Sequence, residues 1–498
     1  MRTVIGIDVG TTHIKSILFA SDGRVLQKVK SATPLSSDGF GSVYKPKEIW
    51  EIVKEQLLGL CRAAKGPVDG ISITGMAEAG LVIDWFTREE KTDIIPWFDK
   101  RTTAQAGRSD LGTEAGRFAT TGLHNSFKYG IYKFMWLLEH GELNKKRAVW
   151  LSMCDYIAFK LTGQLVTDPT FAARTYVYDM IRGCWDVDEI RSKGLELYNF
   201  PKVIPSGEIC GECGFLKNGS SIPVAIAGHD HVCAAYGLLY GKKDAICDSA
   251  GTSETYIGVL RELPEEGFLH DTGVLYGPFV DGEWFYMASV PSSGHSIEWF
   301  RKKMQLSELS YTEMNRKLGT LSQDPTGVLY FPYLTGMGSP WYTAFMHGTL
   351  LGLSENDDGM KILKAIMEGI QYQALWLLGI LSDAHKAGNS ELVCAGGAVK
   401  NQYLMQLKAD ILNRKVNASQ QEEATLCGAA ALYLRKNHDS SNHGGLAGEF
   451  LERSLGQKET YTPDGDLAKK YKKIADERYL PMVKILRDYY KAWGNEYE

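Results

Sequence analysis

The sequence predicts a mixed α/β protein built from two similar halves. Short runs rich in β-branched residues alternate with longer segments that have the spacing of amphipathic helices. A motif near the N-terminus has a counterpart near residue 245, and 498 residues suffice for two or three domains that each bury a core. Because 44% of the residues are hydrophobic and 23% are charged, the composition is that of a globular protein and excludes a disordered chain.

The first elements are predicted from β-branched runs and helical spacing. Residues 4–7 and 14–20 are apolar runs joined by a Gly-Thr-Thr turn, a pattern typical of a hairpin. Residues 47–64 have helical periodicity, and residues 69–73 are predicted to form the next strand. The apolar face of the helix consists of Ile49, Ile52, Val53, Leu57 and Leu60.

The C-terminal half follows the same alternation. Residues 363–381 and 402–412 are predicted helices on either side of a strand at 392–394. A stretch bearing His, Ser and Gly at 437–447 is expected to be a surface loop. Residues 466–493 have helical periodicity and carry many lysines.

Two segments resemble each other and indicate an internal duplication. Residues 4–19 and 245–259 each place an Asp at the end of a strand, then a small-residue turn, then a second apolar strand. The turns read Gly-Thr-Thr and Gly-Thr-Ser, with spacings that differ by one residue. The sequence therefore predicts two domains, residues 1–242 and 243–498, that each begin with such a hairpin.

Charge, cysteines and hydropathy restrict the function and the compartment. The net charge of −5 argues against a dedicated nucleic-acid binder, and no apolar stretch approaches the ~18 residues that a membrane helix needs. The N-terminal apolar run is broken by Asp8, and nine scattered cysteines favour reduced thiols, so we expect a cytoplasmic protein. Cys210 and Cys213 have C-x-x-C spacing but are predicted to lie in a Gly/Pro-rich loop without a second ligand pair, which favours a structural role.

The N-terminal motif G-I-D-V-G-T-T contains the residue types that bind phosphate. Gly10 lets backbone amides turn toward a ligand, while Thr11 and Thr12 add hydroxyl donors. Lys15 on the returning strand can direct a cation to the same phosphates, and Asp8 is placed to hold Mg²⁺ through water. The alternative is a tight hairpin whose side chains only satisfy turn amides.

Two further glycine-bearing turns strengthen the phosphate interpretation, in a chain with 52 glycines. Gly251 and Thr252 would bind nucleotide phosphates from the second half. In C-A-G-G-A-V-K-N a strand ends at Gly396 and Gly397, and a helix with Asn401 in its first turn follows. Alone, such a turn is more often structural, but the three elements together predict a site for the phosphates of a nucleotide, with Mg²⁺ at Asp8.

Asp230, in the motif G-H-D-H, is the candidate catalytic base. Phosphoryl transfer to a hydroxyl needs a group that accepts the proton, and the apolar helix predicted to follow would partly shield this carboxylate. The alternative is that Asp230 caps that helix. His229 and His231 form an H-x-H pattern, but the sequence offers no third metal ligand at a suitable spacing.

Taken together, these motifs resemble the FGGY family of carbohydrate kinases, which includes glycerol kinase and xylulokinase. The resemblance runs from about residue 4 to residue 434. It rests on G-I-D-V-G-T-T, G-I-S-I-T-G-M-A-E-A-G, K-F-M-W-L-L-E-H, A-G-H-D-H-V-C-A-A-Y-G, S-A-G-T-S, F-P-Y-L-T-G and G-G-A-V-K-N. It implies two ribonuclease-H-like domains of the actin, hexokinase and Hsp70 type, with ATP in the cleft between them.

The resemblance also implies residue roles. Asp230 matches the family's catalytic aspartate, and His231 stands where glycerol kinase has a substrate-contacting amide. Ala77 and Glu78 match the position of an Arg-Glu pair in glycerol kinase and a Met-His pair in xylulokinases, so the arginine and the histidine are both absent here. Asp99 matches the stretch beside the sugar. The N-terminal domain would then carry the sugar site and the C-terminal domain the adenosine site.

The sequence therefore predicts an ATP- and Mg²⁺-dependent kinase of a ketopentose or a related polyol. Glycerol, another polyol or a sugar acid is the alternative substrate within the same family. A chaperone- or filament-type nucleotide switch, or an inactive sugar-sensing regulator, is the alternative from another class. The expected partner is a small sugar or polyol rather than a nucleic acid or a membrane, and the family suggests a homodimer.

Overall fold

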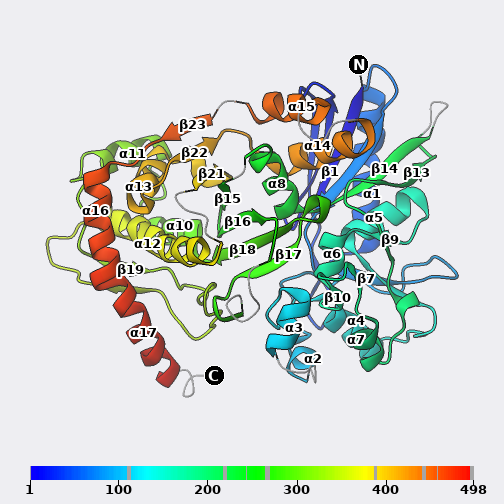
Figure 1. The fold of residues 1–498 in the computed structure, drawn as a ribbon, viewed down its shortest axis with the longest axis horizontal. Coiled ribbons are helices and arrows are strands. Elements are labelled where there is room, and N and C mark those ends of the chain that lie inside the picture. The colour runs from blue at the N-terminus through cyan, green and yellow to red at the C-terminus, as the bar shows by residue number, and fades with distance from the viewer. Residues whose placement is uncertain are drawn as a thin grey trace. The chain divides into compact units, whose positions relative to one another are not determined.

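The computed structural model describes residues 2–108, 114–216, 221–242, 244–263, 270–385, 390–439, 445–456 and 458–493 (Figure 1). Contacts along the chain divide it into two compact units, which we describe separately. The first unit comprises Met1–Gly241, Tyr276–Phe285 and Glu423–Leu455, and the second comprises Lys242–Leu275, Tyr286–Glu422 and Gly456–Glu498. The second unit thus begins near the predicted boundary, while two later segments return to the first unit.

The first unit is built on a six-stranded mixed sheet with the order β13-β14-β6-β1-β2-β3. β1 pairs parallel with β6, which pairs parallel with β14, whereas β2, β3 and β13 run antiparallel to their neighbours. The strands are β1 (Thr3–Val9), β2 (His13–Ala20), β3 (Val25–Ala32), β6 (Gly70–Gly75), β13 (Ile209–Cys213) and β14 (Ile222–His229). The predicted N-terminal hairpin is confirmed as β1 and β2, and the predicted strand at residues 69–73 is confirmed as β6.

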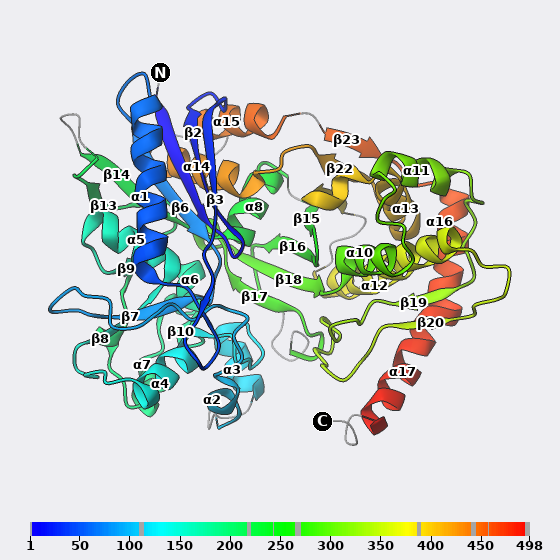
Figure 2. The same cartoon turned by 180° about the vertical axis from the view of Figure 1, so that it is seen from behind.

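Helices cover both faces of this sheet because its inner strands β1 and β6 are buried on both sides. On one face, the Ser72 hydroxyl donates 2.8 Å to the carbonyl of Ala429 in α14 (Ala424–His438), which packs against α8 (Asp230–Leu239). On the other face lie α1 (Pro46–Ala63) and α5 (Met153–Thr162), and Figure 2 shows α1 in front of the strands. The predicted helix at 47–64 is confirmed.

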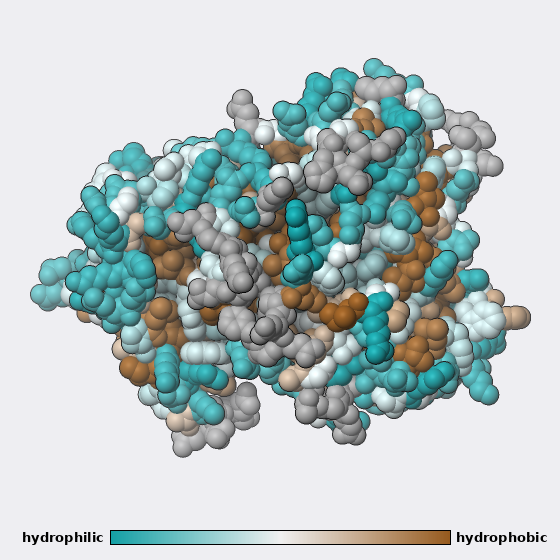
Figure 3. All heavy atoms as spheres, viewed as in Figure 1, coloured by the Kyte–Doolittle hydropathy of each residue, from teal (hydrophilic) through white to brown (hydrophobic). Residues whose placement is uncertain are grey.

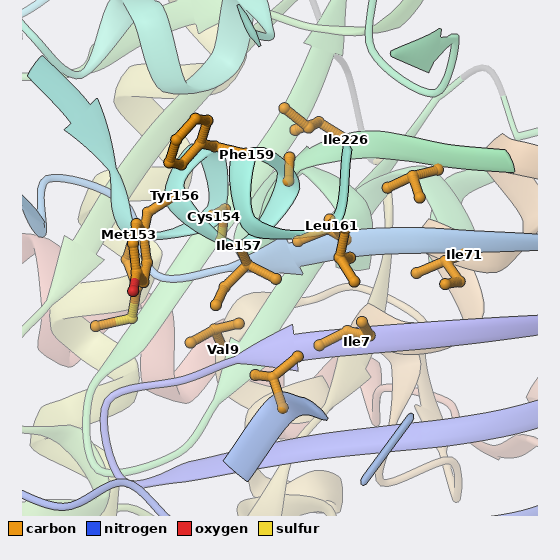
Figure 4. Close-up of a cluster of buried hydrophobic side chains, with 14 of the residues drawn as sticks. Ile7, Val9, Ile71, Met153, Cys154, Tyr156, Ile157, Phe159, Leu161 and Ile226 are labelled. Atoms are coloured by element: carbon orange, nitrogen blue, oxygen red, sulfur yellow. The ribbon is translucent and has the colours of Figure 1, made fainter. Parts of the chain in front are cut away.

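The core of the first unit lies between its sheet and helix α5. Figure 4 shows side chains of α5, including Ile157 and Leu161, packed over Ile7 and Val9 of β1. All four side chains are buried, and the cluster extends to α1 through Ile49, Val53, Leu57 and Leu60. This packing supports the register of β1, β6 and β14, and that register determines which residues lie together at the ends of the three strands.

The second unit repeats the plan of the first. Its strands belong to a seven-stranded sheet with the order β17-β18-β16-β15-β21-β22-β23, although residues 276–278 of β17 are assigned to the first unit. In this sheet β15 pairs antiparallel with β16 and parallel with β21, β21 pairs parallel with β22, and β22 pairs antiparallel with β23. The strands are β15 (Ala245–Ala250), β16 (Glu254–Leu260), β17 (Leu275–Pro278), β18 (Trp284–Val290), β21 (Glu391–Ala395), β22 (Val416–Ser419) and β23 (Lys458–Tyr461). β15, β16, β21 and β22 thus correspond to β1, β2, β6 and β14, which supports the predicted duplication.

Helices α12 (Gly359–His385) and α13 (Gln402–Leu412) flank β21, as predicted. The C-terminal helical segment consists of α16 (Gly465–Ile474), one π-helical turn at Ala475–Tyr479 and α17 (Leu480–Trp493). The unit also contains α10 (Ser293–Lys303), α11 (Tyr311–Gly319), β19 (Leu329–Phe331), β20 (Thr349–Leu351) and η3 (Gly397–Lys400).

The remaining elements of the first unit are short and surround its sheet. They are β4 (Ser36–Ser37), β5 (Ser42–Val43), β7 (Gly80–Asp84), α2 (Thr103–Gly107), α3 (Glu114–Thr121), α4 (Gly130–His140), β8 (Ala148–Ser152), β9 (Val166–Thr167), α6 (Pro169–Ala173), β10 (Tyr178–Asp179), β11 (Cys184–Trp185), α7 (Val187–Ser192), η1 (Leu197–Asn199), β12 (Lys202–Val203), η2 (Val280–Gly282) and α15 (Gly445–Leu455). Of the predicted loop at 437–447, residues 440–444 lie outside the described residues, and α14 and α15 border them.

The prediction that Cys210 and Cys213 lie in a loop is wrong. Both belong to β13, an edge strand paired with β14, and the Cys210 thiol lies 3.2 Å from the carbonyl oxygen of Val224. Each has a free thiol. The prediction failed because the flanking Gly and Pro residues end the strand rather than disrupt it.

The face shown in Figure 3 is mostly hydrophilic, with apolar side chains in separate patches. Among the described residues, the search for membrane spans found no helix with the length and apolar character needed to cross a bilayer.

Candidate functional site

Three parallel strands of the first unit end at the same edge of its sheet. Val9 at the end of β1 and His229 at the end of β14 both lie in register with Gly75 at the end of β6. In open α/β sheets this carboxyl edge is where ligands bind. The residues that follow the strands are the hairpin turn after Val9, Glu78 and Asp230. The fold therefore gathers the predicted residues of the N-terminal half at one edge.

Asp230 is the first residue of α8, and its carboxylate is held by both neighbouring histidines. His229 Nε2 lies 3.0 Å from Asp230 Oδ1, and the backbone amide of His231 donates 2.6 Å to the same oxygen. Burial disfavours the charged form, but the positive charges of His231 and His229 and the His229 hydrogen bond lower the pKa of Asp230 to about 2. Asp230 is therefore an ionised acceptor at neutral pH and does not act as the helix cap, a position that His229 occupies.

Asp8 is a buried carboxylate whose surroundings favour the binding of a cation. Burial, reinforced by the negative charge of Asp230, raises the pKa of Asp8 to about 7, against a smaller opposing effect of Lys15. Its buried Oδ1 has no hydrogen-bond partner among the described residues. A hydrated Mg²⁺ would neutralise this carboxylate and satisfy the oxygen, so the residue fits the predicted metal.

The first hairpin turn is tied down by its neighbours. The Thr33 hydroxyl donates 2.8 Å to the Gly10 carbonyl, and the indole of Trp97 donates 3.0 Å to the Thr11 hydroxyl. Thr12 is exposed. These contacts hold the turn in one shape and leave Thr12 exposed to solvent.

Lys15, the predicted phosphate-binding cation, pairs with Asp8 in the register of the hairpin. Its ammonium group lies 2.9 Å from Glu423 Oε2, while Lys28 pairs with Oε1 of the same glutamate at 2.6 Å. Sequence reasoning missed Glu423, because it belongs to the segment just before α14, far along the chain. Glu423 holds the Lys15 side chain beside the turn.

Glu78 is paired with an arginine that sequence reasoning missed. Arg174, directly after α6, donates 2.7 Å from Nε to Glu78 Oε1 and also bonds that oxygen through Nη2. Both side chains are about nine-tenths buried. Burial disfavours charge on Glu78, but Arg174 first and then His229, Lys128 and Lys133 lower its pKa. Glu78 is therefore an ionised hydrogen-bond acceptor near Asp230 and His231.

The other residues predicted to contact the sugar differ in their exposure and in their hydrogen bonds. His231 is partly exposed beside Asp230, and burial lowers its pKa, which favours a neutral ring able to contact a hydroxyl. Ala77 is buried and offers only its backbone. Asp99 accepts hydrogen bonds from the Ser42 amide and from the Arg101 side chain and amide. Both carboxylate oxygens of Asp99 are thus used to hold the loop that carries Arg101, which indicates a structural role.

In the second unit, the predicted nucleotide residues lie at the corresponding carboxyl edge. Gly251 and Thr252 form the turn after β15, and Gly396 and Gly397 follow β21. A Cβ at Gly396 would lie 2.5 Å from the Ala250 carbonyl, whereas one at Gly397 would meet nothing within 4 Å. Gly396 thus packs against the hairpin and Gly397 borders open space, where a ligand can approach closely.

Asn401 caps α13 and does not belong to its first turn. Its side-chain oxygen accepts a 3.0 Å hydrogen bond from the amide of Leu404. The buried Nδ2 of Asn401 has no partner among the described residues. The side-chain oxygen of Asn401 therefore stabilises the start of α13, while its amide nitrogen can donate a hydrogen bond to a ligand.

Comparison with known proteins identifies relatives over nearly the whole chain. A profile of the FGGY family of carbohydrate kinases, N-terminal domain, matches residues 3–237, and the profile of the C-terminal domain matches residues 248–436. A xylulose kinase of Bacillus subtilis (strain 168) is 28% identical over 496 residues, covering 96% of each chain. A glycerol kinase of Vibrio campbellii is 27% identical over 452 residues, covering 86% of this chain and 88% of that protein.

Solved structures show the same fold at lower identity. The gluconate kinase from Lactobacillus acidophilus has a TM-score of 0.88 and 21% identity over 99% of each chain. The Plasmodium falciparum glycerol kinase with ADP has a TM-score of 0.85 and 19% identity over 97% of this chain and 98% of that one. The predicted two-domain fold of the actin and hexokinase type is thereby confirmed. The chain belongs to the FGGY family of carbohydrate kinases and is an ATP- and Mg²⁺-dependent phosphotransferase that acts on a sugar or polyol.

Proposed function

We propose that the protein phosphorylates a hydroxyl of a ketopentose or a related open-chain polyol, with Asp230 as the general base. The observation that carries this proposal is the ionised Asp230 carboxylate at the same sheet edge as the buried Glu78–Arg174 pair. A proton acceptor and a charged hydrogen-bond acceptor for hydroxyls therefore belong to one unit. The xylulose kinase relative, which aligns over 96% of both chains, supports the ketopentose.

The acceptor hydroxyl would be oriented before any proton moves. Glu78, kept ionised by Arg174, accepts hydrogen bonds from substrate hydroxyls, and the neutral ring of His231 contacts another. Asp230 accepts the proton of the attacking hydroxyl as the phosphoryl group is transferred. Its low pKa suits this task, because phosphoryl transfer has a loose transition state in which the proton moves late and a strong base is unnecessary.

The phosphates of ATP would be bound by the two hairpin turns. In the first unit these are Gly10, Thr11 and Thr12, with Lys15 held beside them by Glu423. In the second unit they are Gly251 and Thr252. Asp8 would hold Mg²⁺, which when bound would supply positive charge to stabilise the charge that develops on the phosphates. Gly396, Gly397 and Asn401 form the proposed site for the adenosine part of ATP.

The test is an ADP-release screen over C3 to C7 polyols, ketoses, aldoses and sugar acids. We expect the highest kcat/KM for a ketopentose or an open-chain polyol, and Asp230→Asn should lower kcat by about 10²–10⁴-fold with an unchanged ATP KM. Asp464→Asn is the matched control, since Asp464 caps α16 and has no place in the proposed site. Glycerol as the best substrate would exclude the ketopentose and leave the polyol, and a sugar acid would contradict both. Sugar-independent ATP turnover would favour a nucleotide switch.

We also propose that the protein works as a cytoplasmic homodimer without nucleic-acid or membrane partners. The free thiols and the net charge of −5 support the compartment and the absence of a nucleic-acid partner. Light scattering after gel filtration would test the oligomeric state, and a monomeric mass at micromolar concentration would contradict the dimer.

A further inference from the structure

The second phosphate turn is bracketed by two carboxylates. Asp248 lies in β15 three residues before Gly251, and Glu254 begins β16 directly after the turn. Ala250 pairs with Glu254 and Asp248 pairs with Tyr256, so both carboxylates lie on the same face of the hairpin. Each strand thus contributes one buried acid just behind the turn.

One lysine binds both acids. Lys408 of α13 forms ion pairs through Nζ with Asp248 Oδ2 and with Glu254 Oε1. All three side chains are almost completely buried, with exposed fractions of 0 to 2%. Burial opposes the charge of Lys408, but the two carboxylates hold its pKa above its usual range, so it remains an ammonium ion. A single cation therefore joins the two strands on either side of the turn.

The same acids are bound by other groups of the second unit. The Cys394 thiol lies 3.1 Å from Asp248 Oδ2, and the hydroxyls of Tyr256 and Ser293 donate to Glu254 at 2.5 and 2.7 Å. These contacts fix both carboxylates from β21, β16 and the start of α10.

The turn itself is held by the start of α10. The amide of Gly294 donates 3.2 Å to the Gly251 carbonyl, and the amide of His295 donates 2.9 Å to the Thr252 carbonyl. Because these carbonyls are turned toward α10, the turn has one defined shape. Lys408 lies behind it and supports both of its ends.

We propose that Lys408 is a positioning residue for the second phosphate turn, acting through Asp248 and Glu254. Replacing a buried ion cluster with apolar groups is often neutral or stabilising, so stability alone does not account for three buried charges at this place. Fixing the two ends of a ligand-binding turn does account for them, since a phosphate-binding turn must keep its shape. This inference rests on the proposed assignment of Gly251 and Thr252 to ATP phosphates.

The test compares ligands with and without the terminal phosphates. Calorimetry would measure the binding of Mg²⁺-AMP-PNP and of AMP to the full chain without a sugar. The triple variant Lys408→Met, Asp248→Asn, Glu254→Gln avoids leaving a buried charge unpaired. We expect it to bind AMP-PNP about 10- to 100-fold more weakly and AMP within about twofold of the wild type, because losing a hydrogen bond to a charged phosphate oxygen weakens binding by about that factor.

Two further variants keep the test decisive. Asp248→Asn alone retains the Lys408–Glu254 pair, so it should fold and show a smaller loss for AMP-PNP. Lys364→Met is the matched control, since Lys364 is equally buried in α12 but binds Glu368 and the carbonyl of Asp324. It should lower the melting temperature and leave the ratio of the two affinities unchanged.

The outcomes separate this inference from the function on which it rests. An unchanged ratio of AMP-PNP to AMP affinity in the folded triple variant and in Asp248→Asn would overturn the role of Lys408. A wild-type protein that binds AMP-PNP no better than AMP would instead contradict the assignment of the phosphate turns themselves.

Discussion

Arg174 donates two hydrogen bonds to one carboxylate oxygen of Glu78, a residue 96 positions earlier in the chain. Glu78 has a φ of 60°, a left-handed conformation that is uncommon for a residue other than glycine. Such strain persists where the surroundings hold it, and it concentrates at functional sites. Glu78 therefore has a strained backbone, and the ion pair fixes its carboxylate at the edge of the sheet where the sugar is proposed to bind.

Arg174→Met should weaken sugar binding and leave ATP binding unchanged. Without its partner, Glu78 is a buried unpaired carboxylate, which costs about 3–5 kcal/mol of folding stability and releases its orientation. We expect the sugar KM to rise at least about tenfold while the ATP KM stays within about twofold. Steady-state kinetics with the best substrate of the screen would measure both constants.

Arg117→Met is the control for a general loss of stability. Arg117 is as deeply buried in the same unit but pairs with Asp186 at 2.6 Å. It should lower the melting temperature and leave the sugar KM unchanged. Equal changes in sugar KM for both arginine variants would remove the specific role of Arg174.

Lys15 and Lys28 allow a matched test of the first phosphate turn, because both bind Glu423. Lys15 stands opposite Asp8 in the hairpin, whereas Lys28 belongs to β3. We expect Lys15→Met to raise the ATP KM about tenfold and Lys28→Met to change it less than about twofold, with stability losses below about 1 kcal/mol in both. An equal effect of the two lysines on ATP KM would place the phosphates elsewhere.

Gly396 and Gly397 should respond differently to alanine. Gly396 has a φ of 107° and no room for a Cβ beside the Ala250 carbonyl, so Gly396→Ala should destabilise the protein by about 1–3 kcal/mol. Gly397 borders open space, so Gly397→Ala should keep the melting temperature but raise the ATP KM, because the methyl group occupies space proposed for the nucleotide. Thermal unfolding and steady-state kinetics would be measured for both variants. An unchanged ATP KM in Gly397→Ala would exclude Gly397 from the site.

Lys133 should make stability depend on pH. Burial lowers the pKa of this fully buried amine to about 7, against an opposing effect of Glu78. An unfolded lysine stays protonated to about pH 10.4, so the unfolded state binds more protons between pH 7 and 10 and stability rises with pH there. From pH 7 to 9 the free energy of unfolding should increase by about 2 kcal/mol more in the wild type than in Lys133→Met. Urea unfolding at the two pH values measures this difference, and parallel changes in both proteins would refute it.

The sequence by itself determined the elements and the turn chemistry. The hairpin at the N-terminus, its counterpart near residue 245 and helices such as α1 and α13 follow from local periodicity and from Gly-Thr turns. Asp8 could be selected because it stands at the end of a predicted strand, and Asp230 because it precedes a predicted apolar helix in a motif that resembles the family's catalytic motif. These features are encoded over a few residues, where spacing and side-chain type carry the information.

Only the tertiary structure decided how the candidate residues are used. Arg174 reaches Glu78 across 96 residues, Lys408 reaches Asp248 across 160, and Glu423 reaches Lys15 across 408. The same packing gives Asp99 a hydrogen bond from the amide of Ser42, 57 residues earlier. Partners this far apart leave no periodic signal in the sequence, because the register of the sheets and the helices packed on them bring the charges together and decide which pairs can form.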